Sequence, residues 1–278
     1  MPYTSAEADH RLGRSGDLVE NTFNISSPAK AYFVALDHDM ALHTLTVEIA
    51  LRSDFTAFIA KQALEGKEGY AHSSPVDLAR TNPGPITTEL RKHAQQFMEM
   101  FFARTVDNFQ CYIVDLIRAV LRKKPQILTT SQPSISVETL LRFSSKEEIV
   151  HHIIERKVNS LAYQGFKELQ GWCTERGIPI VLPAARQRYE LPEIIATRNI
   201  IVHNRGSVDE KYLDASAKPS FKIGEPRRLE PADFLGVSQL MSECVLQTDA
   251  AAVSKFDVPV ETWDGQAIMR LLRGSAQE

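Results

Sequence analysis

The sequence lacks the features that stabilise a secreted or membrane-spanning protein. It has only three cysteines in 278 residues, Cys111, Cys173 and Cys244. Their odd number and wide spacing exclude a disulfide framework and a zinc ribbon, and they suit a reducing compartment. No apolar run reaches the ~18 to 20 residues that a membrane-spanning helix needs. The N-terminal segment MPYTSAEADHRLGRSGD has no apolar core behind its charges, so we expect no secretory signal and a cytoplasmic location.

An excess of positive charge is also absent. The chain has 32 basic and 35 acidic residues and a formal charge of −3 at pH 7. This balance excludes a broad basic surface for indiscriminate nucleic-acid binding, so any such contact must be local. Glycine-rich phosphate loops and the motifs G-x-S-x-G and H-E-x-x-H are absent too. The hydrophobic content of 43% and the charged content of 24% nevertheless indicate a folded globular chain.

Apolar residues recur at helical spacing, whereas no alternating strand pattern of useful length is present. The fold class is therefore predicted to be all-α. In the first predicted helix (31–64), Leu42, Leu45 and Ile49 are expected to widen the apolar stripe that faces the core. The second predicted helix (97–121) is apolar on more than one face and should be the central helix. Ser145 and Glu148 match a capping box at the start of the third predicted helix. The predicted helices are residues 31–64, 97–121, 148–174, 185–204 and 231–253.

Breaks in this periodicity suggest a division of the chain. Residues 73–86 are rich in proline and glycine, and residues 126–145 are of mixed character. We expect the two helical parts to form separate units, or else one continuous domain in which 126–145 is a long loop. The predicted parts are a flexible arm (1–28), an N-terminal helical region (29–125), a crossover or linker (126–145), a helical bundle core (146–256) and a C-terminal tail (257–278).

One basic residue interrupts the apolar stripe of the segment ELPEIIATRNIIVHNRG, which starts at Glu190. On an ideal helix, Arg198 falls in the middle of the stripe. An unpaired guanidinium costs several kcal/mol to remove from water. It must therefore meet a carboxylate, a set of carbonyls or a ligand anion, so a structural ion pair and a functional anion site both stay open. The apolar members of the stripe are Leu191, Ile194, Ile195, Ile201 and Val202.

Two more polar residues lie on the same predicted helix. Asn199 and His203 are four residues apart and share a neighbouring face. His203 lies about 140° around the helix from Arg198. It is in the last turn, where the negative end of the helix dipole favours a charged imidazole.

Together these residues form the motif R-N-x-x-x-H, which continues as NRGSVDEKYL. The motif resembles that of the HEPN superfamily of small helical bundles, whose signature is R-x4-H with a polar residue usually after the arginine. The resemblance is closest to HEPN domains linked with RNA cleavage in bacterial toxin and defence systems. It covers about residues 145–255. It implies a HEPN-like helical bundle, to which the first half of the chain adds a helical N-terminal extension.

The resemblance also implies a chemistry. HEPN ribonucleases cut RNA without a metal, so no cofactor is expected. The ribose 2′-hydroxyl attacks the adjacent phosphorus and leaves a 2′,3′-cyclic phosphate and a 5′-hydroxyl. His203 would be the general base or acid, and Arg198 would hold the scissile phosphate. Asn199 would orient His203 or donate to the phosphate.

Two copies of the chain are expected to share this site. Arg198 and His203 cannot both face one phosphate from the middle of a straight helix. Either the helix ends or bends between them, or two chains each contribute a motif. HEPN domains typically pair, so we expect a homodimer that binds RNA, with an antitoxin or defence-system protein as a further partner and no membrane contact. The RNA-binding residues expected around the motif are Asn204, Arg205, Arg156 and Lys157.

Other constellations and other functions stay open. Histidine–carboxylate pairs at i,i+4 could ligate a metal, but solvated helix faces carry such pairs more often, so no metal site is expected. One alternative function is a HEPN-like module that no longer cleaves and serves in nucleotide or RNA binding or in dimerisation. Another is a helical scaffold or regulator. The metal candidates are Glu148 with His152, His151 with Glu155, and Asp37, His38, Asp39 and His43.

Overall fold

The computed structural model describes residues 22–67, 74–131, 135–182, 190–216 and 221–265. Over these ranges the chain is mostly helical, which confirms the all-α class, and a single two-stranded sheet is the only regular β-structure described. The elements are β1 (Thr22–Ser26), α1 (Ser27–Leu64), α2 (Pro75–Thr81), α3 (Pro85–Lys92), α4 (Ala94–Lys123), the 3-10 helix η2 (Pro125–Ser131), α5 (Val137–Leu140), α6 (Lys146–Tyr163), α7 (Phe166–Glu175), α8 (Leu191–Asn204), α9 (Glu210–Ala215), α10 (Pro231–Phe256) and β2 (Val260–Asp264).

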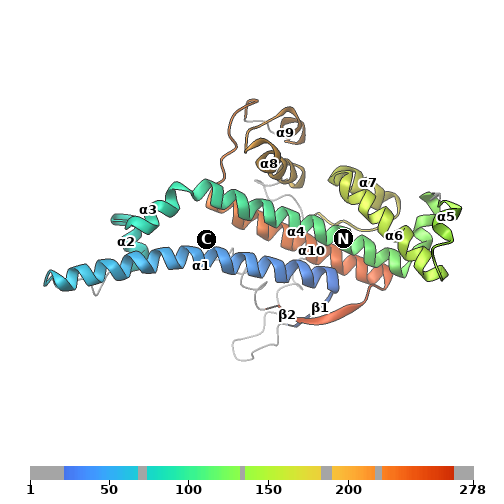
Figure 1. The fold of residues 1–278 in the computed structure, drawn as a ribbon, viewed down its shortest axis with the longest axis horizontal. Coiled ribbons are helices and arrows are strands. Elements are labelled where there is room, and N and C mark those ends of the chain that lie inside the picture. Colours follow the sequence, from blue (N-terminus) through green and yellow to red (C-terminus); the bar gives the residue numbers. More distant parts are fainter. Residues whose placement is uncertain (1–21, 68–73, 132–134, 183–189, 217–220, 266–278) are drawn as a thin grey trace, which may run out of the picture.

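Helix α4 is central, as its broad apolar surface predicts. It contacts α1, α6, α8 and α10, and Figure 1 shows α1, α4 and α10 running side by side. A helix with neighbours on several sides must be apolar around most of its circumference. Met100 is an exception, because its side chain is 54% exposed rather than buried. The residues of α4 that are at most 2% exposed are Phe101, Phe102, Thr105, Val106, Phe109, Tyr112, Ile113, Leu116, Ile117, Val120 and Leu121.

A polar contact fixes the start of α1 against α10. Ser26 is the N-cap of α1, and its hydroxyl oxygen accepts from the Ala29 N–H at 3.3 Å. The Ser26 N–H donates to Oδ2 of Asp249 at 3.0 Å, and its hydroxyl donates to Oδ1 of the same carboxylate. Both residues are buried, and burial raises the pKa of Asp249 while the Ser26 hydrogen bonds oppose that rise.

The small sheet corrects two predictions. Strands β1 and β2 pair antiparallel, with Phe23 opposite Trp263. The end of the predicted arm and the start of the predicted tail are therefore paired with each other. Residues 22–26 (TFNIS) do alternate between polar and apolar, but sequence reasoning missed this single run of five residues. Residues 1–21 of the arm and 266–278 of the tail lie outside the described ranges.

Helix boundaries differ from the prediction at two places. The predicted helix 148–174 is two helices, α6 and α7, because Gly165 adopts a φ of 93° that ends the helical path. The predicted break at 73–86 holds α2 and the start of α3, each opened by a proline in its first turn.

At the start of α6 the Ser145 hydroxyl accepts from the Glu148 N–H at 3.2 Å. The Glu148 carboxylate accepts from Ser144 rather than from Ser145, so only half of the predicted capping box is present.

One hydrophobic core joins residues from both sides of the segment 126–145. It contains Phe33 and Leu36 of α1 and Ile113 of α4, together with Ile154 of α6 and Val245 of α10. Ion pairs add to this contact, since Arg118 and Arg122 of α4 both bind Glu155 of α6, at 3.0 and 3.1 Å. The helices of the first half therefore form part of the surface on which the motif helix lies.

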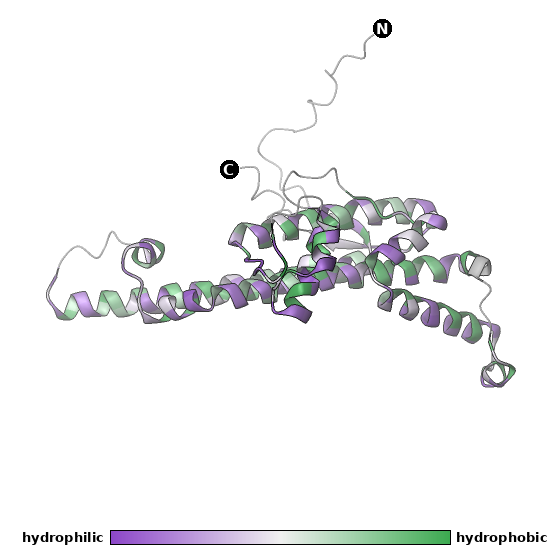
Figure 2. Ribbon diagram, turned by 90° about the horizontal axis from the view of Figure 1, so that it is seen from above, coloured by the Kyte–Doolittle hydropathy of each residue, from purple (hydrophilic) through white to green (hydrophobic). Residues whose placement is uncertain are grey.

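The prediction for the outer side of α1 was wrong. Leu42, Leu45 and Ile49 do not widen the buried stripe, because their side chains are 54%, 53% and 55% exposed. Helix α1 packs on α4 through the opposite side, where Phe33 and Leu36 are buried. In Figure 2 the outer end of α1 extends beyond the other helices and alternates between polar and apolar residues.

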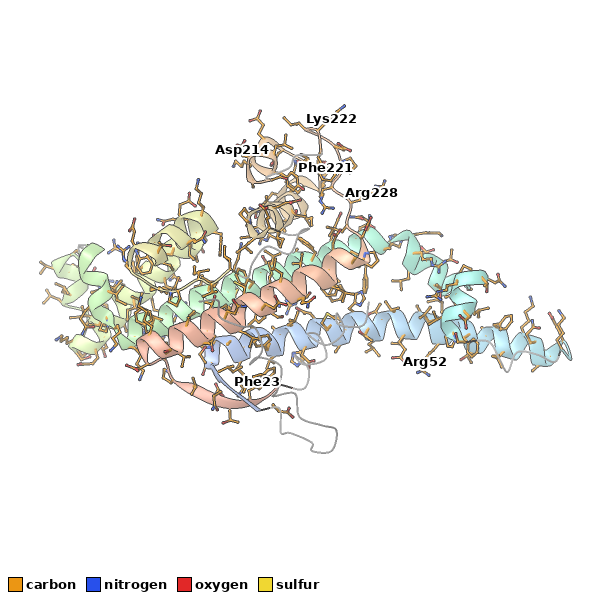
Figure 3. The ribbon with its side chains drawn as sticks, turned by 180° about the vertical axis from the view of Figure 1, so that it is seen from behind. Phe23, Arg52, Asp214, Phe221, Lys222 and Arg228 are labelled. Atoms are coloured by element: carbon orange, nitrogen blue, oxygen red, sulfur yellow. The ribbon has the colours of Figure 1, made fainter. Side chains whose placement is uncertain are left out.

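We predict that Asp249→Ala lowers the free energy of unfolding by about 1 to 3 kcal/mol, because the buried N–H and hydroxyl of Ser26 lose their acceptor. Urea denaturation followed by circular dichroism measures this loss. Asp214→Ala on α9 is the control, since Asp214 is exposed (Figure 3), and its effect should stay within about 0.5 kcal/mol. Equal stabilities of the two variants would contradict the prediction.

Candidate functional site

The motif lies on α8, a regular helix that continues past both key residues. It begins at Leu191 with Pro192 in the first turn and ends at Asn204. Arg205 follows with a φ of 50° and Gly206 with a φ of 75°, and the Gly206 N–H donates to the Ile200 carbonyl at 2.9 Å. This arrangement caps the C-terminus of the helix. The predicted start at 185 falls in a segment, 183–189, that lies outside the described residues.

Two hydrophobic clusters hold α8 in place. Leu191, Ile194 and Ile195 pack in the main core over α4, as the sequence predicts. Ala196 and Ile200 instead join a second cluster, whose other buried members are Val208 and Tyr212. The second cluster exists because the chain turns back at Gly206 and lays α9 against α8.

Tyr212 also fixes α9 to the first turn of α8. Its side chain is fully buried, and its hydroxyl donates to Oε1 of Glu193 at 3.0 Å. Burial raises the pKa of Tyr212, and the nearby Glu193 carboxylate raises it further.

The predicted apolar stripe of α8 is not buried at its C-terminal end, because Val202 is 50% exposed. Ile201 is half-buried against the main core.

Arg198 meets a carboxylate, one of the three partners that the sequence allowed. Its Nε atom lies 2.7 Å from Oδ1 of Asp107 on α4. This contact is ionic, because the Nε–H makes no hydrogen bond of acceptable geometry. The Nη1 group donates to Oδ1 of Asn199 at 3.1 Å. The Arg198 side chain is 21% exposed and that of Asp107 is 44% exposed, so the pair lies at the protein surface and stays in contact with water.

His203 and its polar neighbours lie at or near the C-terminal end of α8, where they are exposed to solvent. Asn199, His203, Asn204 and Arg205 are all exposed, and the Asn204 amide donates to the Ser207 carbonyl at 2.6 Å. Because the helix neither ends nor bends between Arg198 and His203, the two side chains leave it about 140° apart. A single copy of the chain therefore does not bring them together at one phosphate.

Arg156 and Lys157 lie on a separate part of the molecule. They belong to α6, whose Glu155 binds Arg118, and Arg118 is eleven residues along α4 from Asp107. That separation is about 16 Å along the helix axis. Figure 1 likewise shows α6 and α8 at different positions along α4. The basic rim expected beside the motif is thus displaced from it.

The surroundings of Arg156 and Lys157 form a small basic pocket. They line a cavity of about 180 Å³ together with His152 of the same helix. The Lys157 ammonium lies 5.3 Å from the centre of the Trp172 ring. Burial lowers the pKa of Lys157, and the nearby Arg176 guanidinium lowers it further.

Four of the candidate metal ligands have other partners. Glu155 binds the arginines of α4, and the Glu148 carboxylate accepts from the Ser144 N–H at 2.8 Å. His43 lies among the rings of three phenylalanines of the core at 5.2 to 5.4 Å, and its burial lowers its pKa. Asp39 accepts from Arg104 and from Asn108. Within the described ranges, no group of three or more His, Cys, Asp or Glu side chains is placed to hold a metal ion.

Sequence reasoning missed Asp107. It is one of the few acidic residues in the helix 94–123, which is otherwise largely apolar. A carboxylate on a helix expected to be central is a signal that a cation must face it. The sequence did not show which of the 32 basic residues that cation would be.

Comparisons with protein-family models, with curated proteins and with solved structures found no match to this chain. The described helices include none that is both long enough and apolar enough to cross a membrane. Any functional conclusion therefore depends on the residues of the site themselves.

We predict that Arg198→Ala costs only about 1 kcal/mol of folding stability. Asp107 keeps its contact with water when the guanidinium is removed, unlike the stranded partner of a buried pair, which would cost about 3 to 5 kcal/mol. Chemical denaturation of the wild type and the variant checks this value. A loss above about 3 kcal/mol would mean that Arg198 is primarily a structural residue.

Proposed function

We propose that the protein is a metal-independent endoribonuclease of the HEPN type, which acts in the cytoplasm as a toxin or an anti-phage defence effector. The observation that carries the proposal is the complete R-N-x-x-x-H motif at the C-terminal end of a regular helix in an all-α protein. His203, Asn204 and Arg205 are exposed there, where a polynucleotide could reach them. The three cysteines are unpaired, which suits a reducing compartment.

The proposed reaction is a transesterification within the RNA strand. The 2′-oxygen forms a bond to the adjacent phosphorus as the bond from phosphorus to the 5′-oxygen breaks. A neutral imidazole removes the proton of the 2′-hydroxyl, and a protonated imidazole donates a proton to the leaving 5′-oxygen. Histidine suits both tasks near neutral pH, because its unperturbed pKa is about 6.5. Arg198 would neutralise charge that develops on the non-bridging phosphate oxygens.

A dimer would solve the geometric problem of a continuous helix. Since Arg198 and His203 diverge within one chain, the arginine of one copy and the histidine of the other would have to meet at the phosphate. A two-fold axis near the end of α8 would also bring both His203 side chains into one cleft, one as base and one as acid. The exposed Val202, beside His203, gives this face an apolar residue for such a contact.

A second candidate function has one observation in its favour. Arg198 already has a carboxylate partner, Asp107, and a phosphate must compete with it or share the guanidinium. A HEPN-like module that binds a nucleotide or dimerises without cleaving would retain the pair as a structural element. Partial exposure of both side chains keeps the first candidate open, since water and a phosphate can reach the pair.

We predict that the purified wild type cleaves total cellular RNA in the presence of EDTA and leaves 2′,3′-cyclic phosphate ends. His203→Ala and Arg198→Ala should each reduce cleavage by at least about 100-fold. The rate should show a bell-shaped dependence on pH. The ends are identified by treatment with a phosphatase that removes cyclic phosphates, followed by ligation.

His151→Ala is the matched control, since His151 is an exposed histidine of α6 outside the motif, and it should cleave like the wild type. Cleavage that needs a divalent metal would contradict the proposed mechanism. If neither the wild type nor His203→Ala cleaves RNA, the binding module becomes the better interpretation.

We predict opposite effects of Arg205→Gly on stability and on RNA binding. Arg205 adopts the left-handed conformation, which costs an L-residue about 1 kcal/mol and glycine almost nothing. The variant should therefore be more stable by roughly 0.5 to 1 kcal/mol. It should bind single-stranded RNA more weakly, with a salt dependence reduced by about one phosphate contact. Unchanged RNA affinity would remove Arg205 from the binding surface.

A further inference from the structure

The side of α1 that faces away from the core carries a stripe of six residues, in which three consecutive apolar members are flanked by three polar ones. All its residues are exposed, and they are spaced alternately four and three apart, which is the a and d pattern of a coiled coil. Figure 3 shows Arg52, one of them, on the side of α1 away from α4 and α10. The outer stripe consists of His38, Leu42, Leu45, Ile49, Arg52 and Thr56.

This outer stripe is not explained by the fold. Leu42, Leu45 and Ile49 form one patch at i, i+3 and i+7, and each exposes more than half of its side chain. They remain exposed although α1 contacts α2, α3, α4, α10, β1 and β2, so the described elements do not cover this patch. A grouped apolar patch of this kind on a long helix marks an interaction surface.

The charges around the stripe indicate what kind of partner fits it. Arg52 donates to Oε1 of Glu48 one turn earlier at 2.6 Å, so the flank is locally neutral. A membrane-binding helix would carry several lysines or arginines and aromatic residues along such a face, and this one does not. A strongly acidic or basic protein partner would gain nothing from a neutral flank. The pattern instead suits a second apolar helix with the same spacing.

We propose that the outer stripe binds the same stripe of a second copy of the chain in an antiparallel two-helix contact. In such a pair, a positions lie opposite d positions. A two-fold axis at residue 47 places Leu45 opposite Ile49 of the partner copy, and Ile49 opposite its Leu45. The polar His38 and Thr56 then lie opposite each other at the two ends. The pairing is isologous, so one self-complementary surface is sufficient.

Charge selects this direction over the parallel one. A parallel pair would place Arg52 against Arg52 of the other copy in the interface, which costs energy through like-charge repulsion. The antiparallel pair places Arg52 opposite Leu42, where its aliphatic stem covers the apolar side chain and its guanidinium stays at the edge with Glu48.

The expected contact is modest in size. With the axis at residue 47, the two 38-residue helices overlap for about 52 Å. A helix-wide strip of that full length would bury on the order of 600 Å² per chain, and the stripe itself, about 27 Å long from His38 to Thr56, supplies about half of it. Both areas are below the ~800 Å² per partner of standard interfaces. We therefore expect a dimer that dissociates in the micromolar range.

This interface is distinct from the paired motif of the proposed ribonuclease. Helix α8 contacts α4 on one side, and α1 contacts α4 on another, so that Figure 1 has α8 and α1 on opposite sides of α4. A dimer formed through α1 alone leaves the two copies of His203 far apart. The inference therefore stands independently of the proposed function.

Sedimentation velocity of the full chain between about 1 and 300 µM tests the proposal. We expect a concentration-dependent monomer–dimer equilibrium that Leu45→Glu and Ile49→Glu each shift to monomer by at least about tenfold in Kd. Because both residues are exposed, the circular dichroism spectrum and the melting temperature should not change. Val137→Glu on α5, where the side chain is 71% exposed, is the matched control and should leave the equilibrium unchanged.

Cross-linking tests the direction of the pair. All proteins carry C111S, since Cys111 is the exposed native thiol. A mixture of L45C and I49C proteins should form a disulfide-linked heterodimer on mild oxidation, and neither protein alone should do so. A parallel pair would cross-link each variant to itself, and that result would overturn the antiparallel arrangement.

The remaining outcomes also decide the question. A chain that is monomeric at every concentration, or a dimer that survives Leu45→Glu, overturns the inference. A dimer lost with Val202→Glu but not with Leu45→Glu assigns the contact to the end of α8, which contradicts this proposal and supports the paired motif. RNA cleavage in EDTA, measured separately, reports on the proposed function alone.

Discussion

The burial of α4 is the constraint on which the rest of the structure depends. Its apolar residues face in several directions, so no single neighbour can cover them. Helices α1 and α10 run along it, and α6 and α8 cover what remains. The motif helix has its position because it covers part of α4. The same packing brings Asp107 to Arg198, a contact between residues 91 positions apart in the chain.

Helical periodicity in turn limits what the motif can do. Five residues on an α-helix amount to one turn and about 140°. Since α8 stays regular up to Asn204, Arg198 is directed to α4 while His203 lies at the exposed C-terminal end. A phosphate that contacts both groups must therefore receive them from two copies. This requirement links the catalytic hypothesis directly to the oligomeric state.

The two proposed contacts between copies use different surfaces, which lie on different sides of α4. The end of α8 combines Val202 with polar residues, whereas the outer stripe of α1 is longer and more apolar. An isologous contact through either one gives a closed dimer. Contacts through both would link copies into larger assemblies, in which each α1 pair joins two motif pairs.

The sequence by itself determined the helical class, the central place of α4 and the need of Arg198 for a partner, whether a carboxylate, a set of carbonyls or a ligand anion. Each of these follows from local spacing or from the cost of an unpaired charge, which act within one or two turns of a helix. Only the tertiary structure decided that Asp107 is the partner, that Leu42, Leu45 and Ile49 remain exposed, and that residues 22–26 pair with 260–264. Periodicity shows that a helix has an apolar face, but not which faces receive a neighbour, because that depends on how many helices the chain supplies and where they fit. Pairing between the two ends of the chain likewise depends on contacts more than 200 residues apart, which no local pattern records.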